Sequence, residues 1–172
     1  MDFIDLKSQY RALREPINAA IQRVLDHGQY ILGPEVGELE CALAGYLGVK
    51  HVVGVNSGTD ALVLALAAHG IGPGDEVVVP SHTFLATASA VCAVGATPVF
   101  ADVDARTMVV DEACFAAKLT PRTRALIPVH LNGFPCDMDP IAALARQHDL
   151  VLLEDTAQAL GATRDGRKAG TW

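Results

Sequence analysis

The sequence has no uninterrupted apolar segment long enough to cross a membrane. Its longest uncharged apolar runs, 61–68 and 86–94, are far shorter than the roughly 20 residues that a bilayer requires. The amino terminus, which opens with Met1, Asp2 and Phe3, lacks the basic and apolar regions of a signal peptide. We therefore expect no membrane-spanning helix and a cytoplasmic protein.

The sequence also lacks the features of metal-binding and nucleic-acid-binding proteins. The four cysteines include no Cys-x-x-Cys pair, and the six histidines form no close His/Cys group, so no metal site is predicted. We interpret the cysteines as buried free thiols. The net charge of -7 argues against a nucleic-acid partner, because such a partner is bound through a basic surface.

What the sequence does contain is typical of a globular domain, with 51% apolar and 19% charged residues. The first 50 residues have helical periodicity and are interpreted as an N-terminal helical segment. Pro16 is placed in the first turn of one helix, which ends at Gly28. Pro34 starts a second helix, which ends at Gly48. Between them, residues 29–33 are expected to form an exposed loop.

From residue 51 onward, short apolar segments alternate with helical ones. Apolar strands separated by helices predict an α/β fold, with a mostly parallel sheet covered by helices on both faces. Arg164-Asp165-Gly166-Arg167 predicts a hairpin turn, and the glycine-rich segment 70–74 a turn between a helix and a strand. The expected strands are 51–55, 76–80, 97–101, 125–129 and 150–154, and the expected helices are 59–69, 83–94, 112–119 and 138–148.

Ligands of parallel sheets gather where the strands end, so the residues after each strand are the candidates for a site. Asn56-Ser57-Gly58-Thr59-Asp60 leads directly into a helix, whose first N–H groups and dipole could hold a phosphate. Alternatively, Ser57 or Thr59 only caps that helix. The segment is neither a Walker loop nor a dinucleotide fingerprint.

Two further candidates follow other strands. Phe84 could stack on a flat ring, although a single phenylalanine can equally belong to the core. Glu154-Asp155, with Gln158, follows an apolar strand, where a carboxylate needs a donor or a cation. Asp155 could pair with a protonated ring nitrogen of a ligand, or it could cap the following turn.

Together these segments resemble the DegT/DnrJ/EryC1/StrS family of sugar aminotransferases, which are fold-type I enzymes of the aspartate-aminotransferase superfamily. The resemblance extends along the whole chain. It rests on Asp5-Leu6-Lys7-x-Gln9-Tyr10, Gly28-Gln29-Tyr30-Ile31-Leu32-Gly33-Pro34-Glu35-Val36, Ser57-Gly58-Thr59-Asp60-Ala61-Leu62, Gly72-Pro73-Gly74-Asp75-Glu76-Val77, Thr83-Phe84-x-Ala86-Thr87, Gly95-Ala96-x-Pro98-Val99-Phe100, Pro128-Val129-His130-Leu131 and Glu154-Asp155-x-Ala157-Gln158.

The resemblance implies that residues 51–172 are part of the large domain that binds pyridoxal 5′-phosphate. Gly58 and Thr59, with Ser57 beside them, match the phosphate anchor of the cofactor, and Phe84 matches the aromatic ring that stacks on its pyridine ring.

Asp155 matches the catalytic aspartate that keeps the pyridine nitrogen protonated, and Gln158 matches the residue near the ring hydroxyl. Asn132 and Leu160 depart from the common tyrosine and histidine of the family, which leaves their effect on substrate choice open. The family carries its Schiff-base lysine in a Phe-Ser-Phe-x-x-x-Lys segment soon after the position of Gly170. This sequence ends at Trp172, so we expect a truncated chain that is inactive alone.

The resemblance further implies an amino-acid donor, expected to be glutamate, a nucleotide-linked keto-sugar as acceptor, and a homodimer. The opening residues and the loop at 28–36 look most like enzymes that act on 3-keto sugars. One alternative is another fold-type I enzyme, such as a threonine aldolase or a cysteine desulfurase. The other is an inactive or regulatory remnant of the fold. The sugar, the nucleotide and the pathway stay open.

Overall fold

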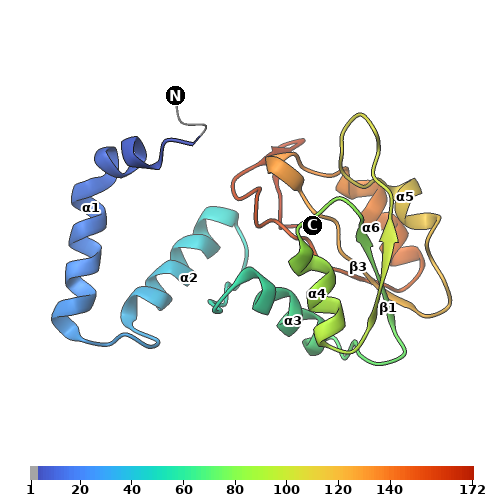
Figure 1. Ribbon diagram of the computed structural model, residues 1–172, viewed down its shortest axis with the longest axis horizontal. Helices are drawn as coiled ribbons and strands as arrows, with labels where there is room; N and C mark the ends of the chain where they lie inside the picture. Colours follow the sequence, from blue (N-terminus) through green and yellow to red (C-terminus); the bar gives the residue numbers. More distant parts are fainter. Residues whose placement is uncertain (1–3) are drawn as a thin grey trace. The chain divides into compact units, whose positions relative to one another are not determined.

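The computed structural model describes residues 4–172, so the first three residues of the predicted 1–50 segment lie outside the described residues. The chain divides into two compact units between Gly54 and Val55 (Figure 1). The first unit contains α1 (Leu6–His27) and α2 (Pro34–Leu47). The second contains α3 (Gly58–Ala68), β1 (Glu76–Pro80), α4 (Leu85–Ala93), β2 (Thr97–Ala101), α5 (Glu112–Ala116), β3 (Thr123–Leu126), the 3₁₀ turn η1 (Leu131–Gly133), α6 (Met138–Gln147), β4 (Val151–Leu152), β5 (Thr163–Arg164) and β6 (Arg167–Lys168).

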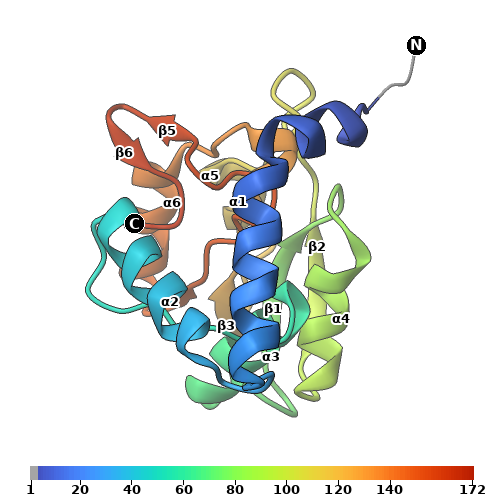
Figure 2. The ribbon, with the colours of Figure 1, turned by 90° about the vertical axis from the view of Figure 1, so that its left-hand side faces the viewer.

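Helix α1 begins earlier than the sequence pattern predicts. Asp5 is its N-cap and accepts a hydrogen bond from the Ser8 N–H at 2.9 Å, so the placement of Pro16 in the first turn is wrong. Pro16 lies inside the helix, where its missing N–H removes one backbone hydrogen bond and its ring crowds the preceding turn. Figure 2 shows that α1 changes direction in its N-terminal part, as a proline inside a helix favours.

The other helix boundaries of the first unit agree with the prediction. Gly28 ends α1 and Gly48 ends α2, both with positive φ values of 70° and 75°. Pro34 is in the first turn of α2, where no N–H is needed. In the loop between the helices, Ile31 is 88% exposed and Leu32 83%, which confirms an exposed loop.

Within the described chain, the second unit contains a parallel sheet of four strands in the order β2-β1-β3-β4. The bounds of β1 and β2 are those predicted. Strand β3 begins and ends earlier than the predicted 125–129, and β4 is shorter at both ends than the predicted 150–154. Pro128 explains the interruption, because it has no N–H to donate to a neighbouring strand. Pairing resumes directly after it as an isolated parallel bridge between Val129 and Asp155.

The predicted strand at 51–55 is wrong. These residues have no strand conformation, and Val53 is 75% exposed. Apolar β-branched residues favour a strand only where a neighbouring strand accepts and donates hydrogen bonds. In the sheet of residues 4–172, the two edge strands are β2 and β4, and neither pairs with residues 51–55.

Both faces of the sheet are buried under helices. Val78 and Leu126 point into one cluster with Phe115 of α5 and Ile141 of α6. Their neighbours in the strands point to the opposite face, because successive side chains of a strand alternate. That second cluster consists of Leu66, Ile71, Val77, Val79, Val91, Ala96, Ala125 and Ile127, from the sheet, α3, α4 and adjoining turns. This confirms the α/β class with a doubly covered sheet.

Three smaller predictions have mixed outcomes. The antiparallel pair β5–β6 with a turn at Asp165 and Gly166, both with positive φ, confirms the hairpin. The four cysteines are free, but only Cys136 is buried, while Cys92 lies on the exposed side of α4. No helix within residues 4–172 is both long enough and apolar enough to cross a bilayer.

A buried glutamate closes the N-terminal end of the sheet. Glu76, the first residue of β1, is 5% exposed and accepts hydrogen bonds from the Thr120 hydroxyl and from the Arg122 guanidinium, whose Nε lies 2.9 Å away. The Thr120 bond, followed by those from Arg122, lowers the pKa of Glu76 below its ordinary value. Glu76 thus lies at the N-terminal end of β1, on the side of the sheet opposite to the C-terminal strand ends.

We predict that a polypeptide of residues 1–172 expressed alone is prone to aggregation. Strand β4 would be a free sheet edge, and the apolar residues 51–55 would lack strand partners, so both would favour association with other chains. Size-exclusion chromatography over a range of concentrations should show oligomers. The prediction is wrong if the polypeptide unfolds cooperatively as a soluble monomer whose amides at 51–55 are protected from hydrogen exchange.

Candidate active site

A cavity of about 220 Å³ lies in the second unit, where β3 and β4 end and α3 and α4 begin. It can hold a small ring compound, since one water occupies roughly 30 Å³ in the liquid. The turns that follow predicted strands thus converge at one place, as expected for a parallel sheet. Five of the six predicted cofactor-binding residues line this cavity: Gly58, Thr59, Phe84, Asp155 and Gln158.

Ser57, the sixth residue, has a different position. It is the N-cap of α3, and its Oγ accepts a hydrogen bond from the Asp60 N–H at 3.1 Å and donates to Asp60 Oδ2 at 3.0 Å. The capping interpretation therefore describes the observed contacts of Ser57. Gly58 and Thr59 contribute the first N–H groups of α3, which have no acceptor inside the helix, and both residues line the cavity.

Asp155 is fixed from several sides. Its N–H donates to Pro128 O at 2.9 Å, and its carbonyl accepts from the His130 N–H at 3.1 Å. Its carboxylate accepts from the Thr87 hydroxyl at 3.1 Å and from the Ala157 N–H at 3.2 Å. The main chain and both carboxylate oxygens of Asp155 are therefore held in place at the wall of the cavity.

Thr87 belongs to a short chain of hydroxyl groups. Its Oγ1 lies 3.0 Å from Thr83 Oγ1, and its side chain is buried, with only 1% exposed. Because the Thr87 hydrogen points to the Asp155 carboxylate, the Thr83 hydroxyl is the donor to Thr87. In the sequence, both threonines belong to a motif of the family resemblance, but neither was predicted as a site residue. Their spacing of four residues after a strand was the available signal, because it places two hydroxyls on one side of a helix start.

Gln158 is oriented by a backbone group. Its Oε1 accepts a hydrogen bond from the Asn132 N–H at 2.7 Å. Since the amide oxygen is occupied, the amide nitrogen is the end of Gln158 that can donate to a ligand in the cavity. Asn132 itself has a φ of 54°, a conformation that asparagine tolerates better than tyrosine does.

Phe84 is not a core residue, because 72% of its surface is exposed. It is the residue before α4 and lies at the cavity, so its ring is available to a flat ligand. Leu160 is 64% exposed and does not line the cavity. Nor does any lysine of the described chain line it, and Lys168 lies in β6 of the hairpin.

Residues 11–172 match the family model described as the DegT/DnrJ/EryC1/StrS aminotransferase family. The chain belongs to this family. It is 53% identical over 168 residues to the dTDP-3-amino-3,4,6-trideoxy-alpha-D-glucose transaminase of Streptomyces venezuelae, which covers 98% of this chain and 44% of the relative. It is 52% identical over 169 residues to the UDP-N-acetyl-3-dehydro-alpha-D-glucosamine 3-aminotransferase of Acidithiobacillus ferrooxidans, covering 98% and 46%.

A solved structure of the same family has the same fold. The crystal structure of DesV from S. venezuelae in complex with a ketimine intermediate superimposes with a TM-score of 0.96 at 52% identity, over 99% of this chain and 46% of that chain. The chain thus spans about half the length of the family members it matches. The DegT/DnrJ/EryC1/StrS resemblance and the fold predicted from the sequence are confirmed by these matches.

We predict that Thr87→Val loosens the site locally. Valine keeps the shape of threonine but removes the hydroxyl between Thr83 and Asp155, and a hydrogen bond of this kind contributes about 1 kcal/mol. Native-state hydrogen exchange in the complete protein should show the opening free energy at Ala157, which binds the same carboxylate, reduced by about that amount. The control, Thr97→Val at the exposed start of β2, should leave Ala157 unchanged. Equal effects of both variants would contradict the prediction.

Proposed function

We propose that this chain forms the cofactor-binding part of a pyridoxal 5′-phosphate-dependent aminotransferase. The observation that carries the proposal is the composition of one cavity. It brings together the N-terminus of α3, an exposed phenylalanine and a carboxylate held by Thr87 and the main chain. A phosphate, a flat ring and a ring nitrogen need these three kinds of group.

The residues of the cavity fit the proposed cofactor one by one. The N–H groups of Gly58 and Thr59 would hold the phosphate at the positive end of α3, and Phe84 would stack on the pyridine ring. Asp155 would accept the N–H of the ring nitrogen. Gln158 would donate its amide N–H to the ring hydroxyl, because its oxygen is already bound to Asn132.

When bound, pyridoxal 5′-phosphate supplies an electron-withdrawing ring that stabilises negative charge on the amino acid during transamination. Asp155 would keep the ring nitrogen protonated, and the bonds from Thr87 and Ala157 would keep its carboxylate in place. A proton at the reacting carbon has to be moved by a separate base. Because no lysine of the described residues lines the cavity, residues 1–172 alone would bind the cofactor without turnover.

The proposed acceptor is a nucleotide-linked sugar with a ketone at C3, and the proposed donor is glutamate. The names of the S. venezuelae and A. ferrooxidans relatives both describe an amino group at C3 of a nucleotide-linked sugar. These relatives match almost the whole of this chain at over half identical residues, which supports the same substrate class here. We place the protein in the cytoplasm, where nucleotide-linked sugars are made and used.

We predict that Asp155→Asn in the complete protein lowers the rate of amino-group transfer at least about 100-fold. This is the lower end of the range for loss of a group that holds or transfers a proton in catalysis. Asparagine keeps the size of the side chain but not the charge opposite the ring nitrogen. Release of 2-oxoglutarate from glutamate measures the effect, and circular dichroism checks the fold. The control is Asp165→Asn in the exposed hairpin turn, which should retain activity. Near-normal turnover of Asp155→Asn would refute the assignment.

We also predict that the complete protein is a homodimer, and that Ile31 and Leu32 in the exposed loop between α1 and α2 take part in the subunit contact. Ile31→Asp should weaken the dimer, because the charge would have to be buried in an apolar contact. Sedimentation and activity should be measured together across a dilution series. A monomer that is fully active at every dilution would contradict the proposal, as would an Ile31→Asp variant with unchanged association.

A further inference from the structure

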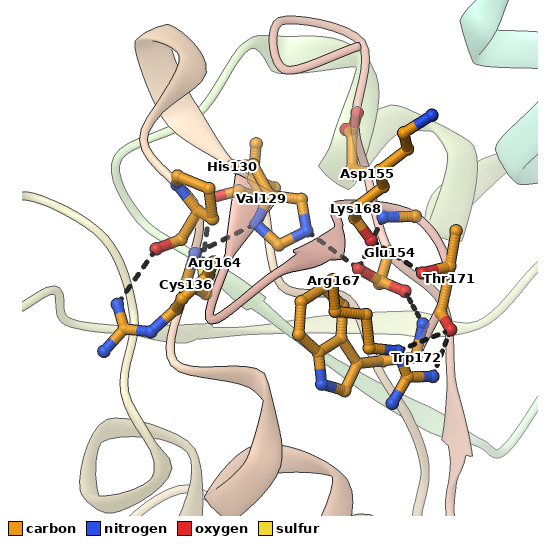
Figure 3. Close-up of polar contacts among 12 residues, drawn as sticks. Val129, His130, Cys136, Glu154, Asp155, Arg164, Arg167, Lys168, Thr171 and Trp172 are labelled. Carbon is orange, nitrogen blue, oxygen red and sulfur yellow. Dashed lines mark hydrogen bonds and ion pairs between the residues drawn. The ribbon is translucent and has the colours of Figure 1, made fainter. Parts of the chain in front are cut away.

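A second carboxylate lies next to Asp155 and points away from the cavity. Glu154 and Asp155 follow β4, and adjacent side chains of an extended chain point to opposite sides. Figure 3 shows the two carboxylates on opposite sides of the main chain. Asp155 contacts Thr87 of α4, whereas the side chain of Glu154, only 7% exposed, points into the interior.

The hydrogen-bond partners of the Glu154 carboxylate are donors that come from other segments. Its Oε2 accepts from His130 Nε2 at 3.0 Å and from the Gly170 N–H at 2.8 Å, and its Oε1 accepts from the Trp172 N–H at 2.7 Å. Burial raises the pKa of Glu154, but the bonds from His130, Trp172 and Gly170 together outweigh it, so its pKa lies below the ordinary value. Ionised Glu154 therefore stabilises the fold at pH values above its ordinary pKa, and this stabilisation is lost as the pH falls through its lowered pKa.

The direction of the His130 bond follows from the second nitrogen of the ring. His130 is fully buried, and its Nδ1 accepts a hydrogen bond from the Cys136 N–H at 3.0 Å. A nitrogen that accepts carries no proton, so the ring proton is on Nε2 and is donated to Glu154. The ring is thereby fixed between a backbone donor and a carboxylate acceptor, as Figure 3 shows.

Glu154 thus joins three segments that are far apart in the sequence. Through His130, Glu154 holds the start of the η1 turn. Asn132, two positions after His130, orients Gln158. Through Gly170 and Trp172 it holds residues 170–172, and the Trp172 ring is fixed in turn by a hydrogen bond to Asp139 at 2.9 Å and by Arg167 stacked over it.

We propose that Glu154 is a positioning residue of the site: with His130 it sets the places of Asp155, of the Asn132–Gln158 pair and of the segment 170–172 relative to one another. This inference rests on the proposed function. It assigns to Glu154 no contact with a ligand, because the cavity is lined by its neighbour Asp155 and not by Glu154. A buried carboxylate with three donors is a suitable anchor, because each lost donor leaves a polar group unpaired.

Glu154→Gln in the complete protein tests the proposal. Glutamine has the same shape but only one acceptor oxygen, so it cannot accept from all three donors. We expect the dissociation constant for pyridoxal 5′-phosphate, measured by titration of its absorbance, to rise about tenfold, by analogy with the loss of a hydrogen-bond partner behind a metal ligand. We also expect a shifted absorption maximum of the bound cofactor and faster hydrogen exchange at Gly170 and Trp172.

Glu76→Gln is the matched control. Glu76 is also a buried glutamate with donors from a threonine hydroxyl and an arginine, but it lies at the opposite end of the sheet. This variant should lose stability while keeping the dissociation constant and the spectrum of the wild type. The proposal is overturned if Glu154→Gln loses stability alone, with unchanged binding and spectrum, or if Glu76→Gln alters the spectrum as Glu154→Gln does.

A milder variant covers the case in which Glu154→Gln does not fold. His130→Asn can still accept from Cys136 but is too short to reach Glu154, so it removes one bond of the network. It should shift the dissociation constant and the spectrum in the same direction, and wild-type values for both would overturn the proposal. A wild-type protein that binds no pyridoxal 5′-phosphate would refute the proposed function. Hydrogen exchange at residues 130–133 and 170–172 would then decide the role of Glu154.

Discussion

Two backbone hydrogen bonds join Asp155 to Pro128 and His130, and the position of the site depends on this pairing. The bonds resume the contact between β3 and β4 beyond the point where Pro128 interrupts it. They place the main chain of residue 155 at the C-terminal ends of the strands, where the segments that precede α3 and α4 also lie. Without this bridge, the carboxylate of Asp155 would not meet the Thr87 hydroxyl, which belongs to a helix 68 residues earlier.

The same pairing explains how one short segment serves two purposes. An extended chain turns successive side chains to opposite sides, so Asp155 lines the cavity and Glu154 enters the interior. The first carboxylate is half-buried and remains available to a ligand. The second is surrounded by three donors and connects the strand end to the η1 turn and to residues 170–172. The two proposed roles, ligand binding by Asp155 and anchoring by Glu154, thus fall on adjacent residues.

Predictions from local patterns succeeded where local physical chemistry decides the outcome. Gly28 and Gly48 end helices because glycine adopts positive φ at low cost, and Pro34 starts one because no N–H is needed there. They failed where the pattern allowed two outcomes. The pattern at Pro16 predicts a helix start, yet the helix begins after Asp5, because a proline pattern alone does not exclude an interior position.

Five of the residues that line the cavity could be predicted from the sequence, helped by the family resemblance. The burial and the hydrogen-bond partners of these residues could not be predicted, because they arise from contacts between distant segments. Residues 51–55 have the composition of a strand and no strand conformation, since a strand requires a neighbour.

The sequence by itself determined the class of fold, the C-terminal ends of α1 and α2, and most of the residues that line the cavity. Only the tertiary structure decided that Ser57 caps α3 while Gly58 and Thr59 line the cavity, and that Asn132 orients Gln158 from 26 residues away. It also decided which of Glu154 and Asp155 faces the cavity. The physical reason is that a side chain's direction and partners depend on the register of the sheet, which is set by pairing across the chain and not by the residue's neighbours in sequence.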